Sequence, residues 1–271
     1  MSSNNLVKEK GIFLFDIEGV IYRGRGTLEP IQSAIDYVNF LKSVGKEVRF
    51  ISNATVKNRE MVYETLKKLG VTVSLEDIFM VGALTAEYIQ RKYGKCKCMV
   101  IGSDVFKADL EKAGITITDS EDCDLVVVAY EKVSYDKLNS ATRALLNGAD
   151  LIAAHMDRVT SSSSGVIMSS GCFVKALEYA ANKKAKVSIG KPSSFFFKRV
   201  LGSFSPSEAV MIGDYIDGDI VGANKNHLSS VLVLTGTSSR GDAEKAKGVR
   251  KPDIVVDSLK ELMKGGYFNK K

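Results

Sequence analysis

Two carboxylates follow an apolar run near the beginning of the chain. Residues 13–15 are Phe, Leu and Phe, and they lead directly into Asp16, Ile17, Glu18 and Gly19. A short apolar run that ends so abruptly is typical of a buried parallel strand, and open α/β sheets bind ligands where such strands end. Side chains two residues apart on a strand point the same way, so Asp16 and Glu18 share one site if the strand extends that far. The pair by itself also fits a strand followed by an acidic turn.

A further strand-end carboxylate lies far along the chain. The apolar residues 210–212 end in Gly213 and Asp214, and a glycine permits a tight exit from the strand. If Asp214 faces Asp16, the two carboxylates suit a hard cation with oxygen ligands, above all Mg²⁺. Asp219 follows in the next turn; we count it with this metal site, where it could orient the ligands from behind.

Polar residues of other kinds follow two more predicted strands. Ser52 and Asn53 come directly after the predicted strand 48–51, and a hydroxyl group with backbone amides at a turn can bind a phosphate oxygen. A helix cap or turn explains Ser52 equally well. Lys191 stands at a strand-to-helix turn, where it could neutralise negative charge; a solvated surface lysine is the alternative. Asp217 fits a helix N-cap better than a metal ligand.

Short buried strands alternate with amphipathic helices and would position these residues. This alternation predicts an α/β fold with a Rossmann-like, mostly parallel sheet and helices on both faces. There are too many strands for one sheet, so we expect an inserted α/β cap domain at residues 81–185 within a core of residues 1–80 and 186–271. The patch 160–165, which contains Ser161 to Ser164, is expected to be a loop. The expected strands are 48–51, 99–101, 125–129, 151–154, 187–189, 210–212, 231–234 and 254–256, and the expected helices include 30–44, 58–69, 85–93, 135–146, 172–181 and 194–201.

Together these residues resemble the motifs of the haloacid dehalogenase superfamily of phosphatases. That family has Asp-x-Asp after the first strand, Ser or Thr after the second, a later lysine, and Gly-Asp-x-x-x-x-Asp after a further strand. The corresponding residues here are Asp16 to Glu18, Ser52, Lys191 and Gly213 to Asp219. The flanking residues 19–24 and 190–193 are similar to the NagD-like and p-nitrophenylphosphatase branch, which is subfamily IIA. The resemblance covers residues 11–256 and implies that the insert is a C2-type cap.

The resemblance implies a Mg²⁺-dependent phosphatase that hydrolyses small phosphomonoesters through an aspartyl-phosphate. Asp16 would attack phosphorus, and Glu18 would act as general acid and base. Asp16, Asp214 and the main-chain carbonyl of Glu18 would hold the metal ion. Lys191 and Ser52 would stabilise charge on the phosphate oxygens. A large cap over the site favours a small phosphorylated metabolite as substrate.

The chain departs from this family in two places. Glu18 replaces the second aspartate, and misplacement of its carboxyl group on the order of 1 Å can cost roughly a hundredfold in rate. The alternative is therefore a catalytically weakened protein that binds a phosphorylated ligand in a regulatory role. In the cap, the family's Thr-Asn-Pro-Asp run is replaced by Ala154, His155, Met156 and Asp157. His155, Met156 and Asp157 are candidates for substrate recognition, together with Asn53 beside Ser52, although a structural or surface histidine is the more ordinary explanation of His155.

Composition narrows the remaining choices. The chain has 271 residues and is 45% hydrophobic, which allows a substantial core. Its formal charge is +6. Its lysines are scattered, so no nucleic-acid partner is expected. The apolar runs are too short to span a bilayer and the first ten residues lack an apolar signal core, so we expect a cytoplasmic protein without a membrane partner. Relatives often form homodimers, which makes a second copy a possible partner. The cysteines lack paired zinc spacing and are expected to be structural thiols: Cys96, Cys98, Cys123 and Cys172.

Other enzyme and signalling classes fit the motifs less well. A receiver-like signalling domain also phosphorylates an aspartate at a strand end, but the length of the chain and the inserted unit disfavour it. No Gly-x-Gly-x-x-Gly follows the first strand, which disfavours a nucleotide-dependent dehydrogenase. The sequence also lacks the Gly-x-x-x-x-Gly-Lys-Ser/Thr run of a P-loop kinase.

Overall fold

The computed structural model describes residues 9–24, 28–130, 132–162 and 165–263, and the chain folds into two compact units. Unit 1 comprises Met1–Ser52, Arg59–Phe79 and Lys191–Lys271, and unit 2 comprises Asn53–Asn58 and Met80–Gly190. The segment of unit 1 before the insertion ends at residue 79, one residue before the predicted core boundary at 80. Unit 1 begins again at residue 191, five residues after the predicted boundary at 186. The segment Asn53–Asn58 packs with unit 2, which the sequence did not indicate.

Unit 1 is built on a six-stranded sheet with the order β15-β14-β13-β1-β4-β5. Its strands are β1 (Ile12–Asp16), β4 (Glu47–Ser52), β5 (Ile78–Met80, whose last residue is grouped with unit 2), β13 (Ala209–Gly213), β14 (Ser229–Val233) and β15 (Ile254–Val256). β1 pairs in parallel with both β4 and β13, and β14 pairs in parallel with β13 and β15. From β1 the chain builds outward through β4 in one direction, and later through β13 and β14 in the other. The sheet therefore reverses its direction of growth between β1 and β13.

Helices cover both faces of this sheet. α2 (Gln32–Ser43) connects β1 to β4, and α9 (Val221–Lys225) connects β13 to β14. Because parallel crossovers are right-handed and these two run in opposite directions, they place their helices on opposite faces. The other elements of unit 1 are β2 (Tyr22–Arg23), β3 (Glu29–Pro30), α3 (Arg59–Lys68), η2 (Leu75–Asp77), α8 (Ser194–Leu201), η3 (Pro206–Glu208), η4 (Ile216–Ile220), α10 (Arg240–Lys245), η5 (Gly248–Arg250) and α11 (Lys260–Met263). The predicted fold class is confirmed.

Unit 2 has its own five-stranded sheet with the order β12-β9-β8-β6-β7 and parallel pairing throughout. The strands are β6 (Lys97–Ile101), β7 (Thr116–Ile117), β8 (Leu125–Val128), β9 (Asp150–Ala153) and β12 (Val187–Ser188), and the helices are α4 (Val81–Tyr93), α5 (Asp104–Lys112), α6 (Tyr135–Leu146) and α7 (Ser170–Ala180). The residues of β8 are fully buried, as the continuous apolar run 125–129 requires of a central strand in a parallel sheet.

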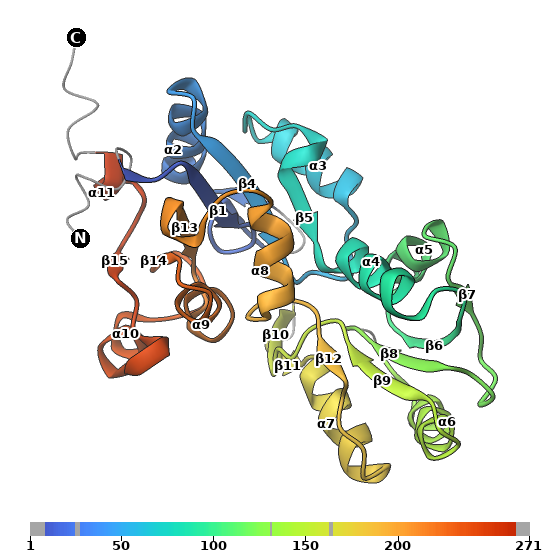
Figure 1. Cartoon of the computed structure of the whole chain (residues 1–271). Coiled ribbons are helices and arrows are strands. Elements are labelled where there is room, and N and C mark those ends of the chain that lie inside the picture. The colour runs from blue at the N-terminus through green and yellow to red at the C-terminus, as the bar shows by residue number, and fades with distance from the viewer. Residues whose placement is uncertain (1–8, 25–27, 131, 163–164, 264–271) are drawn as a thin grey trace. The chain divides into compact units, whose positions relative to one another are not determined.

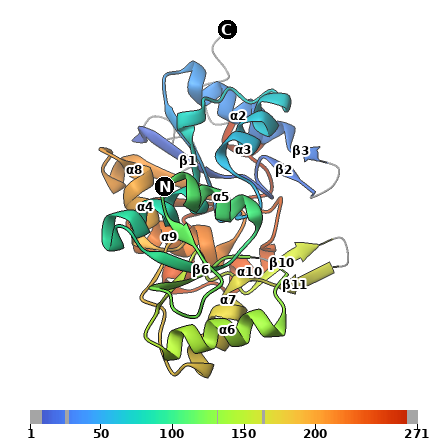
Figure 2. The ribbon, with the colours of Figure 1, turned by 90° about the vertical axis from the view of Figure 1, so that its right-hand side faces the viewer.

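The serine-rich patch differs from the prediction. Residues 160–165 were expected to be a loop, but β10 (Val159–Ser162) pairs antiparallel with β11 (Gly165–Met168) in a hairpin (Figure 2). Ser163 and Ser164 lie outside the described residues. The loop prediction was wrong for the remainder because serine and glycine disfavour strands locally, whereas the ladder here is made by pairing with a partner strand.

The four cysteines form no disulfide. The sulfur atoms of Cys96 and Cys98 lie 3.7 Å apart, and burial raises the pKa of both thiols. Protonated thiols are poor nucleophiles and poor metal ligands, in line with the structural role predicted for them. Among the described residues, no helix is long and apolar enough to cross a membrane.

Glu178 ties the end of unit 2 to helix α7. Its buried carboxylate accepts hydrogen bonds from Lys175 Nζ at 2.7 Å and from the main-chain nitrogen of Ala185 at 3.0 Å. Burial alone would raise the pKa of Glu178, but these bonds outweigh it and the pKa is lowered. A carboxyl group whose folded pKa is depressed stabilises the protein above its unfolded pKa, and that contribution is lost as the pH falls through the folded pKa.

We therefore expect Glu178→Gln to lower the free energy of unfolding by about 1 kcal/mol at pH 7. At pH 3 the difference from the wild type should shrink, because the native carboxyl group is then itself becoming protonated. Urea unfolding at the two pH values measures both effects. Glu64→Gln, on the exposed face of α3, is the matched control and should leave stability unchanged. A Glu178→Gln protein equally destabilised at both pH values would contradict the role of the charge.

Candidate active site

Two acidic residues lie at the topological switch point of the unit 1 sheet, between β1 and β13. Asp16 is the last residue of β1, and Asp214 follows the last residue of β13. These strands are parallel neighbours in which Phe15 is paired with Ile212, so both carboxylates emerge at the carboxyl edge. Ser52 ends β4 on the other side of β1, one residue beyond Ile51, the partner of Asp16. Open α/β sheets bind ligands at this point because the flanking connections diverge there.

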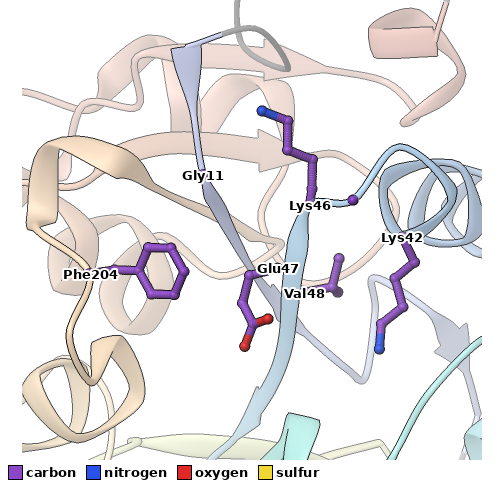
Figure 3. Close-up of a pocket in the computed structure, with 7 residues that line it drawn as sticks. Gly11, Lys42, Lys46, Glu47, Val48 and Phe204 are labelled. Carbon is purple, nitrogen blue, oxygen red and sulfur yellow. The ribbon is translucent and has the colours of Figure 1, made fainter.

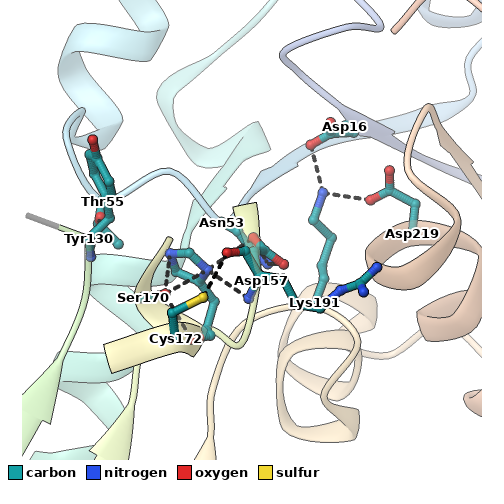
Figure 4. Close-up of polar contacts among 11 residues, drawn as sticks. Asp16, Asn53, Thr55, Tyr130, Asp157, Ser170, Cys172, Lys191 and Asp219 are labelled. Atoms are coloured by element: carbon teal, nitrogen blue, oxygen red, sulfur yellow. Dashed lines mark hydrogen bonds and ion pairs between the residues drawn. The ribbon is translucent and has the colours of Figure 1, made fainter. Parts of the chain in front are cut away.

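Lys191 joins two of the predicted acidic residues (Figure 4). Its Nζ lies 2.6 Å from Asp16 Oδ1 and 2.7 Å from Asp219 Oδ1. The lysine is 4% exposed and Asp219 is 1% exposed, so both charges are removed from water and stabilised mainly by each other. Ser193 caps the helix that follows, since its hydroxyl accepts a hydrogen bond from the Phe195 nitrogen at 3.2 Å. Lys191 is thus a buried bridging cation, and the surface-lysine alternative is excluded.

Burial controls the protonation of this cluster. Desolvation raises the pKa of Asp16 to about 7 and that of Asp219 to about 6, although Lys191 opposes both shifts. Desolvation and the charge of Asp219 also raise the pKa of Asp214. Burial would lower the pKa of Lys191, but the charges of Asp16 and Asp219 outweigh it and raise that pKa. The site therefore holds more acidic groups than one lysine can compensate.

A π-helical turn brings Asp219 back to the strand end. η4 follows β13, and Asp219 Oδ2 accepts a hydrogen bond from the Tyr215 nitrogen at 3.1 Å. Asp217 lies in the same turn, but it is no helix cap: Tyr215 occupies the N-cap position, and the Asp217 carboxylate forms an ion pair with Arg250. The prediction of a cap at Asp217 was therefore wrong, because a single wide turn replaces the expected helix start.

The donor set of this cluster suits a hard divalent cation. Asp16, Asp214 and Asp219 each offer a carboxylate oxygen, and these oxygens lie within 4.8 Å of one another. Three carboxylates beside one ammonium group leave two uncompensated negative charges when all are ionised. Oxygen ligands with excess negative charge are what Mg²⁺ and Ca²⁺ require. Asp219 Oδ1 is already ion-paired with Lys191 and Oδ2 accepts a hydrogen bond from the Tyr215 nitrogen, so this residue fits a supporting position.

Glu18 lies in the loop after β1 rather than on the strand. The strand ends at Asp16, and Glu18 forms an isolated bridge with Tyr22 in a compact turn. Within that turn, the carbonyl oxygen of Ile17 accepts a hydrogen bond from the Ile21 nitrogen at 2.9 Å. The alternation argument for Asp16 and Glu18 therefore does not apply, and the turn sets the position of the half-buried Glu18.

Three of the predicted recognition residues, Asn53, His155 and Asp157, belong to a separate polar cluster in unit 2 (Figure 4). His155 Nδ1 lies 2.9 Å from Asp157 Oδ2, and the Ser170 hydroxyl lies 3.1 Å from the imidazole. The Asn53 amide donates to Asp157 Oδ2 at 3.2 Å. His155 is 4% exposed and Ser170 is fully buried. These bonds favour the structural explanation of His155, and they show that Asn53 is engaged with a carboxylate within unit 2.

A cavity lies away from the acidic cluster in unit 1 (Figure 3). It has a volume of about 530 Å³ and borders the amino ends of β1 and β4, at Gly11 and Glu47. The side chains of Lys42, Lys46 and Phe204 line it. Lys42 is ion-paired with Asp77, and Lys46 donates to the Lys10 carbonyl oxygen at 2.8 Å. The cavity is thus at the opposite edge of the sheet from Asp16.

Sequence reasoning missed one segment of the site. Residues 234–238, which follow β14 and are Leu-Thr-Gly-Thr-Ser, contact Asp214: the nitrogen of Thr237 donates to Asp214 Oδ2 at 2.6 Å. The available signal was a run of hydroxyl residues and glycine directly after a buried strand at the same edge of the sheet.

Comparison with known proteins identifies the family of this chain. The family model described as haloacid dehalogenase-like hydrolase matches residues 13–116, and the model described as HAD-hydrolase-like matches residues 188–262. The sugar-phosphatase AraL of Bacillus subtilis is 29% identical, with 97% of this chain and 96% of that protein covered. The human glycerol-3-phosphate phosphatase is 31% identical, with coverage of 95% and 91%.

A solved structure shows the same fold over almost the whole chain. The p-nitrophenyl phosphatase from Archaeoglobus fulgidus superimposes with a TM-score of 0.87 and 29% identity, and the match covers 94% of this chain and 99% of that one. These relatives bear the names of phosphatases, so the predicted enzyme class, a phosphoric monoester hydrolase, is confirmed together with the predicted family. The chain belongs to the haloacid dehalogenase-like hydrolases.

Proposed function

We propose that this protein is a Mg²⁺-dependent phosphatase that hydrolyses small phosphomonoesters through an aspartyl-phosphate on Asp16. The observation that supports this most directly is the buried Lys191, which bridges Asp16 and Asp219 beside Asp214 at the switch point of the sheet. This arrangement combines a nucleophile, a fixed cation for phosphate charge and an excess of oxygen ligands. The relatives named above support the choice of reaction.

In the proposed first step, a carboxylate oxygen of Asp16 forms a bond to phosphorus while the bond to the leaving oxygen breaks. Glu18 donates a proton to that leaving oxygen. Lys191, whose Nζ already lies 2.6 Å from Asp16 Oδ1, and the Ser52 hydroxyl stabilise the charge on the equatorial phosphate oxygens. In the second step Glu18 takes a proton from water, the water oxygen bonds to phosphorus, and Asp16 is released.

The proposed Mg²⁺ ion would be held by Asp16, Asp214 and the main-chain carbonyl of Glu18. When bound, it would lower the repulsion between the Asp16 carboxylate and the phosphate dianion. Asp219 would support these metal ligands without binding the ion itself. Its carboxylate orients Lys191 through an ion pair and accepts a hydrogen bond from the Tyr215 nitrogen.

The substrate is proposed to be a small phosphorylated metabolite, such as a sugar phosphate or glycerol phosphate. This choice rests on the activities for which the relatives are named and on the proposed role of unit 2 as a cap that excludes water and macromolecules. Asn53, His155 and Asp157 stay predicted recognition residues. The cytoplasmic location, the homodimer and the lack of nucleic-acid and membrane partners also stay predictions.

The test is hydrolysis of p-nitrophenyl phosphate by the purified full chain, with Mg²⁺ and with a chelator, followed by a panel of sugar, glycerol and nucleoside phosphates. We expect release of p-nitrophenol that requires Mg²⁺ and a preference for small esters in the panel. Saturable binding of a phosphate ester without any turnover would instead support the regulatory alternative.

Glu18 is the residue that favours the regulatory alternative. Its replacement by the shorter aspartate helps to distinguish a catalytic site from a regulatory one. We expect Glu18→Asp to keep or raise kcat, by up to roughly a hundredfold, because the shorter side chain restores the spacing that the family uses. Steady-state kinetics with p-nitrophenyl phosphate measure the change. Glu64→Asp on the exposed face of α3 is the control. A large loss of kcat in Glu18→Asp would show that the site is adapted to glutamate.

A further inference from the structure

The loop of residues 234–238 contacts the segment that follows β1. The hydroxyl of Thr235 donates a hydrogen bond to the Gly19 carbonyl oxygen at 2.6 Å, and Arg23 Nε donates to the Thr235 carbonyl oxygen at 2.5 Å. These bonds join parts of the chain more than 200 residues apart in sequence. Thr235 is half-buried, so the loss of its hydrogen bond is only partly replaced by water.

The same loop also holds Asp214. The nitrogen of Thr237 donates to Asp214 Oδ2 at 2.6 Å, and the nitrogen of Ser238 donates to the Asp214 carbonyl oxygen at 2.9 Å. The Ser238 hydroxyl accepts a hydrogen bond from the Ile216 nitrogen at 3.1 Å. Asp214 therefore has both its side chain and its backbone fixed by consecutive residues of one loop.

Close packing brings the two held groups together. A Cβ atom at Gly19 or at Gly236 would overlap the Asp214 carboxylate, so both glycine backbones lie directly against it. Gly19 also has φ +85°, which L side chains rarely adopt. The segment that carries Glu18 is thus in contact with Asp214, and the 234–238 loop holds both.

The orientation of the Glu18 carbonyl follows from the peptide unit that it shares with Gly19. The Gly19 nitrogen donates to the Tyr22 carbonyl oxygen at 2.8 Å. In a trans peptide the N–H and C=O groups point in opposite directions, so the Glu18 carbonyl is turned away from Tyr22. Thr235 fixes the next peptide unit, which leaves the backbone on both sides of Gly19 with little freedom.

We infer that Thr235 is a positioning residue that sets the spacing between the Glu18 carbonyl and the Asp214 carboxylate, and so tunes the affinity of the site for a divalent cation. This inference rests on the proposed function, in which both groups are metal ligands. Thr235 itself acts through Gly19 and touches no substrate. Groups that orient metal ligands in this way typically contribute about 10- to 100-fold to affinity.

The test is direct binding of Mn²⁺ and Mg²⁺ to the full-length chain by calorimetry, without substrate. We expect Thr235→Val, which keeps the shape but removes the hydroxyl, to raise the Kd for both ions about tenfold. Thr235→Ser, which keeps the hydroxyl, should bind within about twofold of the wild type. With p-nitrophenyl phosphate, the Mg²⁺ concentration for half-maximal rate should rise in Thr235→Val, while kcat at saturating Mg²⁺ changes much less.

The matched control is Thr142→Val in α6. Thr142 is also half-buried, and its hydroxyl donates to the Leu138 carbonyl oxygen at 2.9 Å, so it loses the same kind of bond in unit 2. Its Kd for metal should equal that of the wild type. Arg23→Gln, at an exposed position, removes the donor to Thr235 and provides a second variant if Thr235→Val fails to fold; we expect a smaller rise in Kd.

Asp214→Asn separates this inference from the proposed function. If Asp214→Asn loses metal binding while Thr235→Val and Arg23→Gln bind as tightly as the wild type, the inference about Thr235 is wrong and the proposed metal site stands. If Asp214→Asn itself binds both ions with unchanged Kd, the metal site is wrong and the inference falls with it.

Discussion

Replacement of Asp16 by asparagine is expected to lower kcat for p-nitrophenyl phosphate by about 10⁴-fold or more. The amide is nearly isosteric with the carboxylate and can still accept a hydrogen bond from Lys191, which lies 2.6 Å from Oδ1 in the wild type. It is, however, too weak a nucleophile to form a bond to phosphorus. Steady-state rates with saturating Mg²⁺ measure the loss, and circular dichroism establishes that the variant is folded.

Trapping of the intermediate makes this test more specific. Acid quenching of the wild type during turnover of a radiolabelled ester should leave label on the protein that hydroxylamine releases, as expected of an acyl phosphate. Asp16→Asn should carry none. Asp104→Asn is the control, because the Asp104 side chain is 99% exposed on α5, and it should behave as the wild type. Undiminished turnover by Asp16→Asn would reject covalent catalysis by Asp16.

Replacement of Lys191 by methionine is expected to affect both rate and stability. The kcat should fall roughly 10²- to 10³-fold, because a fixed positive charge beside the phosphate oxygens is lost. Without the lysine, the carboxylates of Asp16 and Asp219 are buried without their cation. Breaking a buried ion pair in this way typically costs about 3 kcal/mol or more.

The stability loss of Lys191→Met should depend on pH in a defined direction. In the wild type the pKa of Asp16 is about 7 and that of Asp219 is about 6, and removal of the cation raises both values further. The uncompensated charge therefore exists above these pKa values and disappears as the carboxyl groups take up protons at lower pH.

Urea unfolding of Lys191→Met in the presence of a chelator should show the large loss at pH 8 and a much smaller loss at pH 5. The chelator is needed because a bound divalent cation would replace part of the missing charge. Lys198→Met, on the exposed face of α8, is the control and should be as stable as the wild type. A Lys191→Met protein with wild-type stability at pH 8 would show that the lysine does not neutralise this cluster.

The regular elements were predictable because their signals are local. The helices α6 and α8 span the residues expected of them, 135–146 and 194–201. Each has an amphipathic period and a serine directly before it, Ser134 or Ser193, whose hydroxyl accepts a hydrogen bond from the first turn. The hairpin of β10 and β11 was mispredicted because its ladder depends on a partner strand, and no propensity of serine reports that pairing.

The candidate site was predicted in part for a related reason. Asp16, Ser52 and Asp214 each follow a buried run, so a parallel sheet brings them to one edge wherever its strands lie. The loop of residues 234–238 was missed because its contact with Asp214 depends on the adjacency of β13 and β14 and on the register between them. Whether Glu18 lies on the strand or in a turn was left open, because the sequence does not mark where β1 ends and the turn begins.

The sequence by itself determined the class of fold, the order of the acidic, hydroxyl and lysine motifs, and the family to which they belong. These follow from periodicity and residue type, which survive without knowledge of the partner in space. The tertiary structure alone decided that Lys191 lies between Asp16 and Asp219, since 175 residues separate Lys191 from Asp16 and the strand before Lys191, β12, belongs to a different sheet from β1. It also decided the protonation of the cluster, because burial shifts a pKa only once the surrounding protein has excluded water.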